Sequence, residues 1–271
     1  MPNRTIRSAV SKLEDRHPQP NTTYAMQALR LPARRGWSWI QGGFELLKRN
    51  PPLLIAVTMT YLLSVLLLNL VPVVGPIVLG VSLPSLSVIV ANTFRGVDRF
   101  HGMNLDVMRL GIRRNARGLF RLGLVHLGVS LVVIVVGTTF FGVELAPTGP
   151  GDEAMAANML RLLPMLIIVM LLLWFPPVLV AWHDLPCAKA LFFGVIAVLR
   201  NLPAFLVYAL SVVAIGVLGP FVIMLLLSML WPAATKWLQP MIATLLLFGF
   251  GPVLAASVYV SYRDVFRLPE P

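Results

Sequence analysis

Few side chains in the long apolar stretches of this chain could do chemistry. His126 is the main candidate, because it follows Arg121 by roughly 7–8 Å of helix and lies in a charge-free segment. It could be a shallow ligand or a proton acceptor, although a lone histidine of this kind more often hydrogen-bonds to a neighbouring helix. Asn69 offers a second polar group, which could line a groove or bond between helices. We treat His126 and Asn69 as a candidate polar site within the membrane spans.

The sequence predicts no catalytic or metal site. His183 and Asp184 are adjacent, and adjacent side chains point to different faces of a helix, which favours a helix boundary over a small site. The four histidines and the single cysteine, Cys187, show no metal-ligand spacing. No phosphate loop, nucleophile elbow or HExxH helix is present. We therefore expect no cofactor and no enzymatic activity.

The remaining candidate ligand-binding residues are basic and lie beside apolar stretches. The chain has 22 Lys and Arg against 11 Asp and Glu, a formal charge of +11, which could also suit nucleic acid. Because these cations flank apolar segments, we expect anionic membrane lipids as partners, together with a possible membrane protein, and no nucleic acid. The candidate headgroup contacts are Arg34, Arg35, Lys48, Arg49, Arg113, Arg114 and Arg117.

The elements that must position these residues are membrane-spanning helices. A span needs about 20 apolar residues, and 58% of this chain is hydrophobic while only 12% is charged. Gly216, Gly219 and Pro220 predict a kink in the fifth span. The sequence predicts an all-α integral membrane protein with six transmembrane helices near 52–71, 76–94, 120–142, 162–182, 203–230 and 240–262.

The distribution of basic residues predicts how the chain crosses the membrane. Only Arg161 and Lys236 fall on one side of the six-span arrangement, and every other Lys and Arg falls on the opposite side. Lys and Arg are retained in cytoplasmic loops. We therefore predict a multi-pass protein of the bacterial inner membrane with both termini in the cytoplasm.

An Arg-Asn pair precedes each of three hydrophobic hairpins. The pairs are Arg49-Asn50, Arg114-Asn115 and Arg200-Asn201. Chance similarity between apolar segments is the alternative explanation, but the ordered positions favour a triplicated in–out–in hairpin, at about 35–95, 103–183 and 187–265. Each hairpin is expected to follow a cytoplasmic amphipathic or interfacial helix.

The segment before the first hairpin has the clearest helical pattern. Its apolar residues Trp37, Ile40, Phe44 and Leu47 recur at helical spacing, and Ser38, Gln41, Glu45 and Lys48 share the opposite face. We expect this helix to lie in the inner headgroup layer, or to pack beneath the bundle, and the two are compatible. The corresponding third segment, Ala188–Leu199, is too short to span and is expected to be buried or re-entrant.

Several short motifs resemble a family of inner-membrane proteins of unknown function from Gram-negative bacteria. They are Leu31 to Trp37 (LPARRGW), Arg49-Asn50-Pro51, Leu70 to Pro76 (LVPVVGP), Val180 to His183 (VAWH) and Lys189 to Phe193 (KALFF). The hairpin pattern is also distantly similar to the membrane domain of some glycerophosphodiester phosphodiesterases. The resemblance covers about residues 26–265 and implies a polytopic membrane protein with no catalytic residues. Because such proteins tend to begin near Met26, residues 1–30 are expected to be a disordered tail, and residues 266–271 a short C-terminal tail.

Two functions fit these observations. We favour a membrane-organising or assembly role that involves lipid contact, without a catalytic site. The alternative is a permease or exporter for a small apolar or amphipathic molecule. No span carries Asp, Glu, Lys or Arg away from its ends, which disfavours ion-coupled transport. A transporter needs a polar cavity near mid-membrane, whereas a lipid-organising protein should have a lateral apolar groove or a basic inner face.

Overall fold

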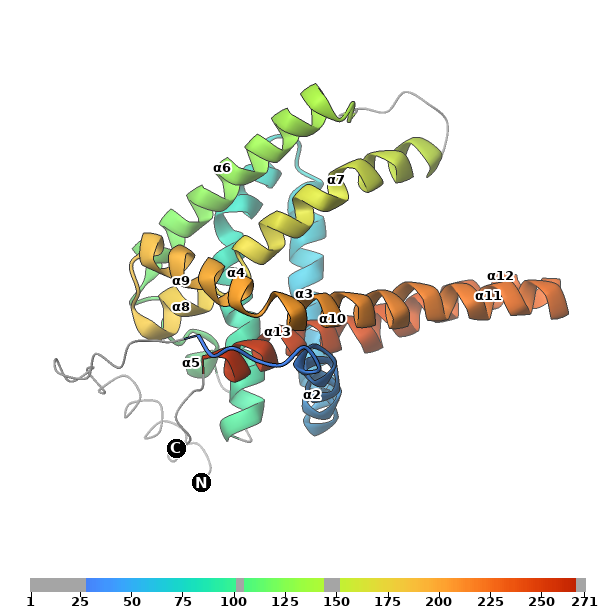
Figure 1. The fold of residues 1–271 in the computed structure, drawn as a ribbon, viewed down its shortest axis with the longest axis horizontal. Helices are drawn as coiled ribbons and strands as arrows, with labels where there is room; N and C mark the ends of the chain where they lie inside the picture. The colour runs from blue at the N-terminus through green and yellow to red at the C-terminus, as the bar shows by residue number, and fades with distance from the viewer. Residues whose placement is uncertain (1–27, 101–104, 144–151, 267–271) are drawn as a thin grey trace. The chain divides into compact units, whose positions relative to one another are not determined.

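The computed structural model describes residues 28–100, 105–143 and 152–266, and every regular element in these ranges is helical (Figure 1). This confirms the predicted all-α class. The α-helices are α2 (Arg35–Arg49), α3 (Pro51–Asn69), α4 (Val74–Phe100), α5 (Leu105–Met108), α6 (Ala116–Phe140), α7 (Asp152–Leu172), α8 (Pro176–His183), α9 (Cys187–Arg200), α10 (Leu202–Val213), α11 (Gly219–Leu230), α12 (Pro232–Leu245) and α13 (Gly251–Val265). Two π-helical turns, η1 (Ala214–Leu218) and η2 (Leu246–Phe250), join α10 to α11 and α12 to α13.

Six helical stretches in the described ranges are long and apolar enough to cross a membrane, which is the predicted number. Most are longer than predicted; the third, for example, begins at Ala116 instead of residue 120. At about 1.5 Å per residue, even the shortest matches a hydrocarbon core of about 30 Å. The six stretches are Pro51–Asn69, Val74–Arg99, Ala116–Phe140, Ala157–His183, Leu202–Leu230 and Thr235–Val265.

The chain forms two compact units. Of the described residues, the first comprises 28–64, 89–100, 105–110 and 196–266, and therefore includes α2, most of α3, the end of α4, α5, the end of α9, and α10 to α13. The second comprises residues 65–88 and 111–195, and includes the turn between α3 and α4, helices α6 to α8, and most of α9.

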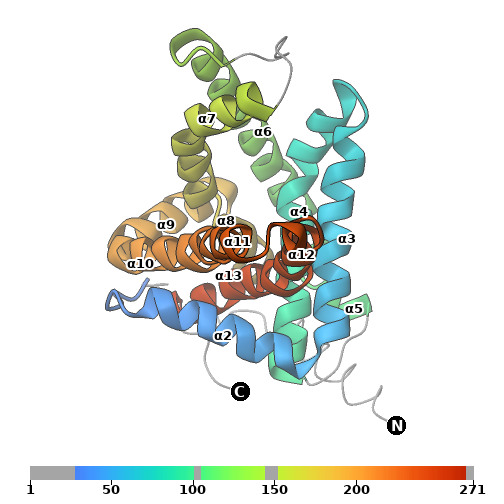
Figure 2. The same ribbon diagram turned by 90° about the vertical axis from the view of Figure 1, so that its right-hand side faces the viewer.

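In the first unit, α2 packs across α10 and α13 (Figure 2). Two glycines of α2 allow this close approach. A Cβ atom at Gly36 would lie 2.1 Å from the carbonyl oxygen of Ala204, and one at Gly43 would lie 2.6 Å from that of Val253. Between them Trp39 is fully buried, with its ring edge-on to Phe205 at 5.2 Å. The helix therefore docks through small residues and one large aromatic ring.

Only part of the predicted apolar face of α2 packs inside the protein. The buried residues are Gly36, Trp39, Ile40, Gly43 and Leu46, whereas Trp37 and Phe44 remain 43% and 40% exposed. The reason is that backbone contact at the two glycines determines which face docks, and glycine contributes nothing to a hydrophobic periodicity. As a result, two aromatic side chains point outward.

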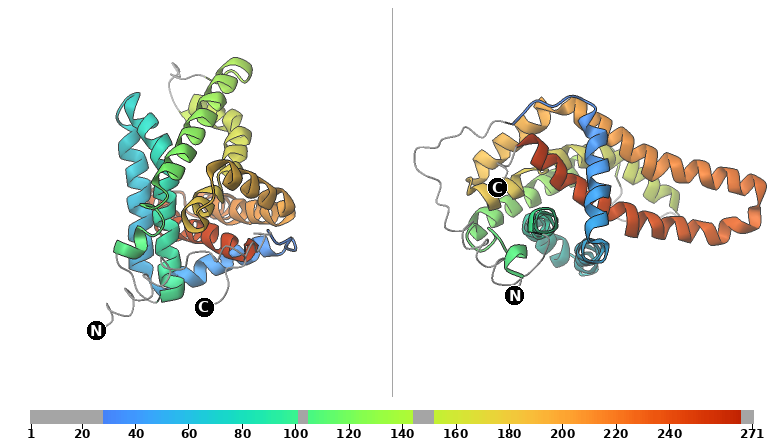
Figure 3. Two further views of the ribbon diagram at one scale, coloured as in Figure 1. Left: turned by 90° about the vertical axis from the view of Figure 1, so that its left-hand side faces the viewer. Right: turned by 90° about the horizontal axis from the view of Figure 1, so that it is seen from below.

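The spans are irregular where proline follows. The predicted disruption near Gly216 is present as η1, which directly precedes Gly219-Pro220. A second π-turn, η2, precedes Gly251-Pro252 and was not predicted. Proline has no N–H to donate and crowds the preceding turn, so the helix widens locally to accommodate it. Figure 3 shows the two long helical runs, α10–η1–α11 and α12–η2–α13, lying side by side.

The fourth span is also interrupted. Helix α7 ends at Leu172 and α8 begins at Pro176, so the chain breaks just before the Pro176-Pro177 pair. The segment α9 after it is a helix with one buried face, which includes Ala190, Gly194 and Ala197, while Phe192 is exposed. Its 14 residues are too few to span a membrane, as predicted.

Most of the predicted N-terminal tail lies outside the described residues, but its end is held in place. Ala28 is buried, the Leu29 N–H donates to the Val265 carbonyl at 2.9 Å, and Asn201 donates to the Leu29 carbonyl at 2.8 Å. The packed chain therefore begins before the predicted boundary at residue 30. Of the predicted C-terminal tail, only Phe266 is described.

Candidate functional site

One buried carboxylate gathers several polar groups in the first unit. Asp98, whose side chain is 9% exposed, accepts from Arg49 Nη1 at 2.9 Å and from Arg263 Nη1 at 2.9 Å. The Tyr259 hydroxyl donates to the same carboxylate at 2.9 Å. Arg49 was predicted to contact lipid headgroups, and the structure gives it this internal carboxylate partner.

A second ion pair lies in the second unit. Arg114 binds Asp184 with two nitrogens, Nε at 2.9 Å and Nη2 at 2.6 Å, in the fork geometry that strengthens such pairs. The Asn115 amide also donates to Asp184, and to the Ala181 carbonyl. Asp184 adopts the left-handed conformation that ends α8, so His183-Asp184 is the helix boundary that the sequence favoured.

The third Arg-Asn pair also anchors a helix, through its asparagine. Asn201 is fully buried; its Oδ1 accepts from the Leu31 N–H at 2.8 Å, and its Nδ2 donates to Leu29 and Ala197. Sequence reasoning identified the pairs but missed the aspartates that bind two of them, Asp98 with Arg49 and Asp184 with Arg114. The available signal was an aspartate at the end of the second helix of each predicted hairpin, and the third such residue, Asp264, has partners outside the Arg-Asn pairs. Asp264 accepts from the Trp39 ring N–H at 3.1 Å and lies 3.7 Å from Arg35.

Four predicted headgroup contacts remain outward and available. Within the described ranges, no ion pair joins Arg34, Lys48, Arg113 or Arg117 to a carboxylate, and all four are exposed. Two of them, Arg34 at the N-cap and Lys48, share a stripe of α2 with its exposed aromatic rings. We call this stripe the α2 outer face; its members, all exposed, are Arg34, Trp37, Gln41, Phe44 and Lys48. The prediction that Gln41 and Lys48 lie on the face opposite those rings was therefore wrong.

The two predicted in-span polar residues line one groove. His126 Nδ1 donates to the Gly80 carbonyl at 3.1 Å, which is the cross-helix bond that the sequence favoured. The Asn69 amide donates within its own helix, to Val65 at 2.8 Å. Both side chains line a hollow of about 400 Å³ in the second unit. Its other lining residues are Val73, Pro76, Ile77, Leu79, Gly80, Leu83, Leu127, Ser130, Leu131 and Ile134.

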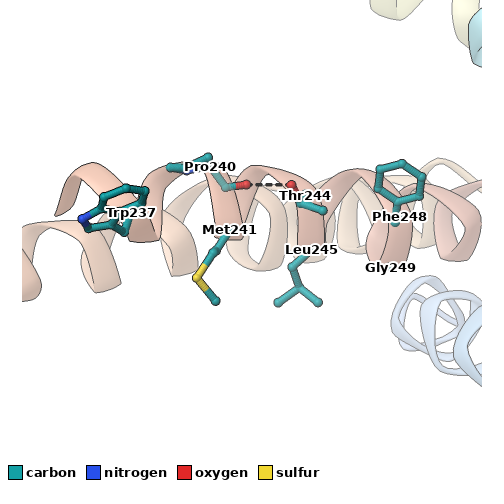
Figure 4. Close-up of a pocket in the computed structure, with 7 residues that line it drawn as sticks. All are labelled: Trp237, Pro240, Met241, Thr244, Leu245, Phe248 and Gly249. Carbon is teal, nitrogen blue, oxygen red and sulfur yellow. Dashed lines mark hydrogen bonds between the residues drawn. The ribbon is translucent and has the colours of Figure 1, made fainter. Parts of the chain in front are cut away.

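A larger hollow of about 690 Å³ lies along α12 and η2 (Figure 4). Its lining residues all come from one stretch, between Trp237 and Gly249, so no groups from different elements converge there. Its Thr244 hydroxyl already donates to the Pro240 carbonyl at 2.8 Å. Among the described residues, no three His, Cys, Asp or Glu side chains lie close enough together to hold a metal ion.

The six apolar helices define a multi-pass helical membrane protein. The chain is 30% identical over 263 residues to a protein of Burkholderia thailandensis described as a probable inner membrane protein, covering 91% of this chain and 96% of that one. This chain belongs to the same family. No family model matches it, and no solved structure matches it. The distant similarity to the membrane domain of glycerophosphodiester phosphodiesterases stays a prediction.

Proposed function

We propose that this protein binds anionic lipids at the cytoplasmic surface of the inner membrane and organises the bilayer there, without catalysis. The observation that carries the proposal is the α2 outer face. It combines two exposed aromatic rings, Trp37 and Phe44, with the exposed cations Arg34 and Lys48. Because both kinds of side chain share one stripe, the rings can enter the acyl-chain boundary while the long side chains of Arg34 and Lys48 snorkel to the lipid phosphates.

The orientation follows from the same cations. Arg34 and Lys48 precede the first span, Arg113 precedes the third, and Arg117 lies in the first turn of the third. The positive-inside rule places these ends in the cytoplasm. Each cation near an anionic surface contributes about 1 kcal/mol of attraction. With both termini on that side, these exposed side chains would meet the same lipid leaflet.

The alternative function, a permease or exporter for a small apolar or amphipathic molecule, would need a polar cavity near mid-membrane, and the groove at His126 is the cavity to compare with that need. That groove is lateral and mostly apolar, with polar groups only at Asn69, His126 and Ser130. We therefore favour lipid binding over transport as the function of this protein.

The depth of α2 tests the proposal. A spin label at Phe44→Cys, in a Cys187→Ser background, should be reached by oxygen but protected from a water-soluble nickel chelate, at about 5–10 Å below the headgroups. Asp106→Cys, on exposed α5, serves as the water-facing control. Equal nickel accessibility at both positions would place the α2 outer face in water and overturn the proposal.

A further inference from the structure

The groove at His126 exists because α4 and α6 cross closely at one level and leave space at another. A Cβ at Gly123 would lie 2.1 Å from the Val81 carbonyl, so the two backbones touch there. Beyond this contact the space is lined by Pro76 and Ile77 on one side and by Ser130 and Ile134 on the other. The result is a lateral hollow inside the second unit, mainly between residues of the second and third spans, with Asn69 at the end of the first span also in its lining.

The hydrogen bond of His126 determines what its ring can offer to a ligand. A carbonyl oxygen can only accept, so Nδ1 carries the proton that it donates to Gly80. In the neutral ring, Nε2 then holds a lone pair and accepts a hydrogen bond. Because His126 lines the groove, its Nε2 is a candidate acceptor in a mostly apolar wall whose other polar residues are Asn69 and Ser130.

The lining also indicates the charge and source of the ligand. Among the described residues that line the groove, none is Asp, Glu, Lys or Arg. A charged group would be expensive at this depth without a counter-charge, so the complementary ligand is neutral. Ile77, Leu131 and Ile134 are about half exposed, so the groove opens toward the lipid that surrounds the spans. Its volume of about 400 Å³ suits one small ligand.

We propose that this groove binds one neutral, single-chain amphiphile from the bilayer, with its hydroxyl donating to His126 Nε2 and its hydrocarbon chain along the apolar wall. The site goes beyond the proposed function, which concerns headgroups at the cytoplasmic surface. It gives His126 two roles: one nitrogen holds the contact between α4 and α6, and the other recognises the ligand.

A photoactivatable long-chain alcohol, added to the protein in nanodiscs, tests this site. Labelling should concentrate on peptides containing Val73–Leu83 and His126–Ile134, saturate, and be competed by the unlabelled alcohol. His126→Leu should lower labelling roughly tenfold, the loss expected for one buried hydrogen bond. His126→Gln keeps both a donor and an acceptor and should retain most of the labelling.

A pair of bulky substitutions distinguishes labelling in the groove from labelling through general contact with lipid. Ile134→Trp fills the groove and should abolish labelling, whereas Val135→Trp, on the neighbouring lipid-exposed position, should leave it unchanged. Non-saturating labelling spread over all exposed spans, or equal labelling of wild type and His126→Leu, would overturn the proposal. If His126→Leu fails to fold, the comparison of Ile134→Trp with Val135→Trp still decides the question.

Discussion

At the scale of single residues, the basic side chains divide into structural and available groups. Arg49 and Arg114 belong to ion pairs with Asp98 and Asp184, whereas Arg34 and Lys48 face outward. The sequence showed which residues are basic and where the Arg-Asn pairs lie. It also showed aspartates at the helix ends, but it could not show which basic residue each one binds, because that depends on which helix ends meet after folding.

Removing the charge of Asp98 should destabilise the first unit. Asp98→Asn leaves Arg49 and Arg263 without their carboxylate, and because both arginines are partly exposed we expect a loss of about 2–3 kcal/mol. Thermal unfolding in nanodiscs measures this loss. Asp106→Asn, at an exposed position, is the matched control. Equal stability of the two variants would mean that the Asp98 cluster contributes little.

The single cysteine gives a pH-dependent test of its surroundings. Burial raises the pKa of the Cys187 thiol, and nearby Arg121 partly opposes this effect. A raised pKa means less reactive thiolate at neutral pH, so maleimide labelling of the folded protein should be slow near pH 7 and speed up at higher pH than for a free thiol. Labelling as fast as that of a free thiol across this range would contradict the burial of Cys187.

At the scale of elements, hydropathy predicted the membrane spans well but the contacts between helices poorly. Length and apolar composition are enough to locate six spans. The docked face of α2 was missed because Gly36 and Gly43, which set it, carry no hydrophobic signal. The turn η2 was missed because a change of helical hydrogen bonding leaves the apolar composition unaltered.

The glycine contact of α2 makes a direct prediction. Gly36→Ala should cost about 1–3 kcal/mol, because its methyl group would meet the Ala204 carbonyl. Gly128→Ala is the control: its methyl would meet nothing within 4 Å, so we expect a small gain from better helix propensity. Thermal unfolding of both variants measures the difference, and a Gly36→Ala variant as stable as Gly128→Ala would refute the close contact.

The three segments that precede the predicted hairpins share one pattern of contact. Each touches the second helix of a hairpin other than the one it leads into: α2 packs on α13, Met108 accepts from Asn92 of α4, and Gly194 of α9 approaches Pro176 of α8. This shared pattern favours the triplicated hairpin that we propose. The Arg-Asn pattern in the sequence predicted the repeats but not the order of these contacts.

At the scale of the whole molecule, the distribution of basic residues predicts which ends of the helices face the cytoplasm. The predicted multi-pass class is confirmed by the six apolar helices and by the relative from Burkholderia thailandensis. We expect a reporter that functions only in the cytoplasm to be active when fused to either terminus, and a reporter that functions only in the periplasm to be inactive there. A periplasmic terminus would reverse the orientation and separate the basic residues from the cytoplasmic leaflet.

The most direct test of lipid binding is native mass spectrometry of the protein from nanodiscs that contain phosphatidylglycerol and phosphatidylethanolamine. The account predicts that wild type retains the anionic lipid preferentially. Arg34→Gln/Lys48→Gln should lose about 2 kcal/mol of this attraction, on the order of 30-fold. Arg109→Gln/Arg200→Gln removes the same charge from other exposed positions and should change retention much less. Equal retention of both lipids by wild type, or equal loss in both double variants, would contradict the account.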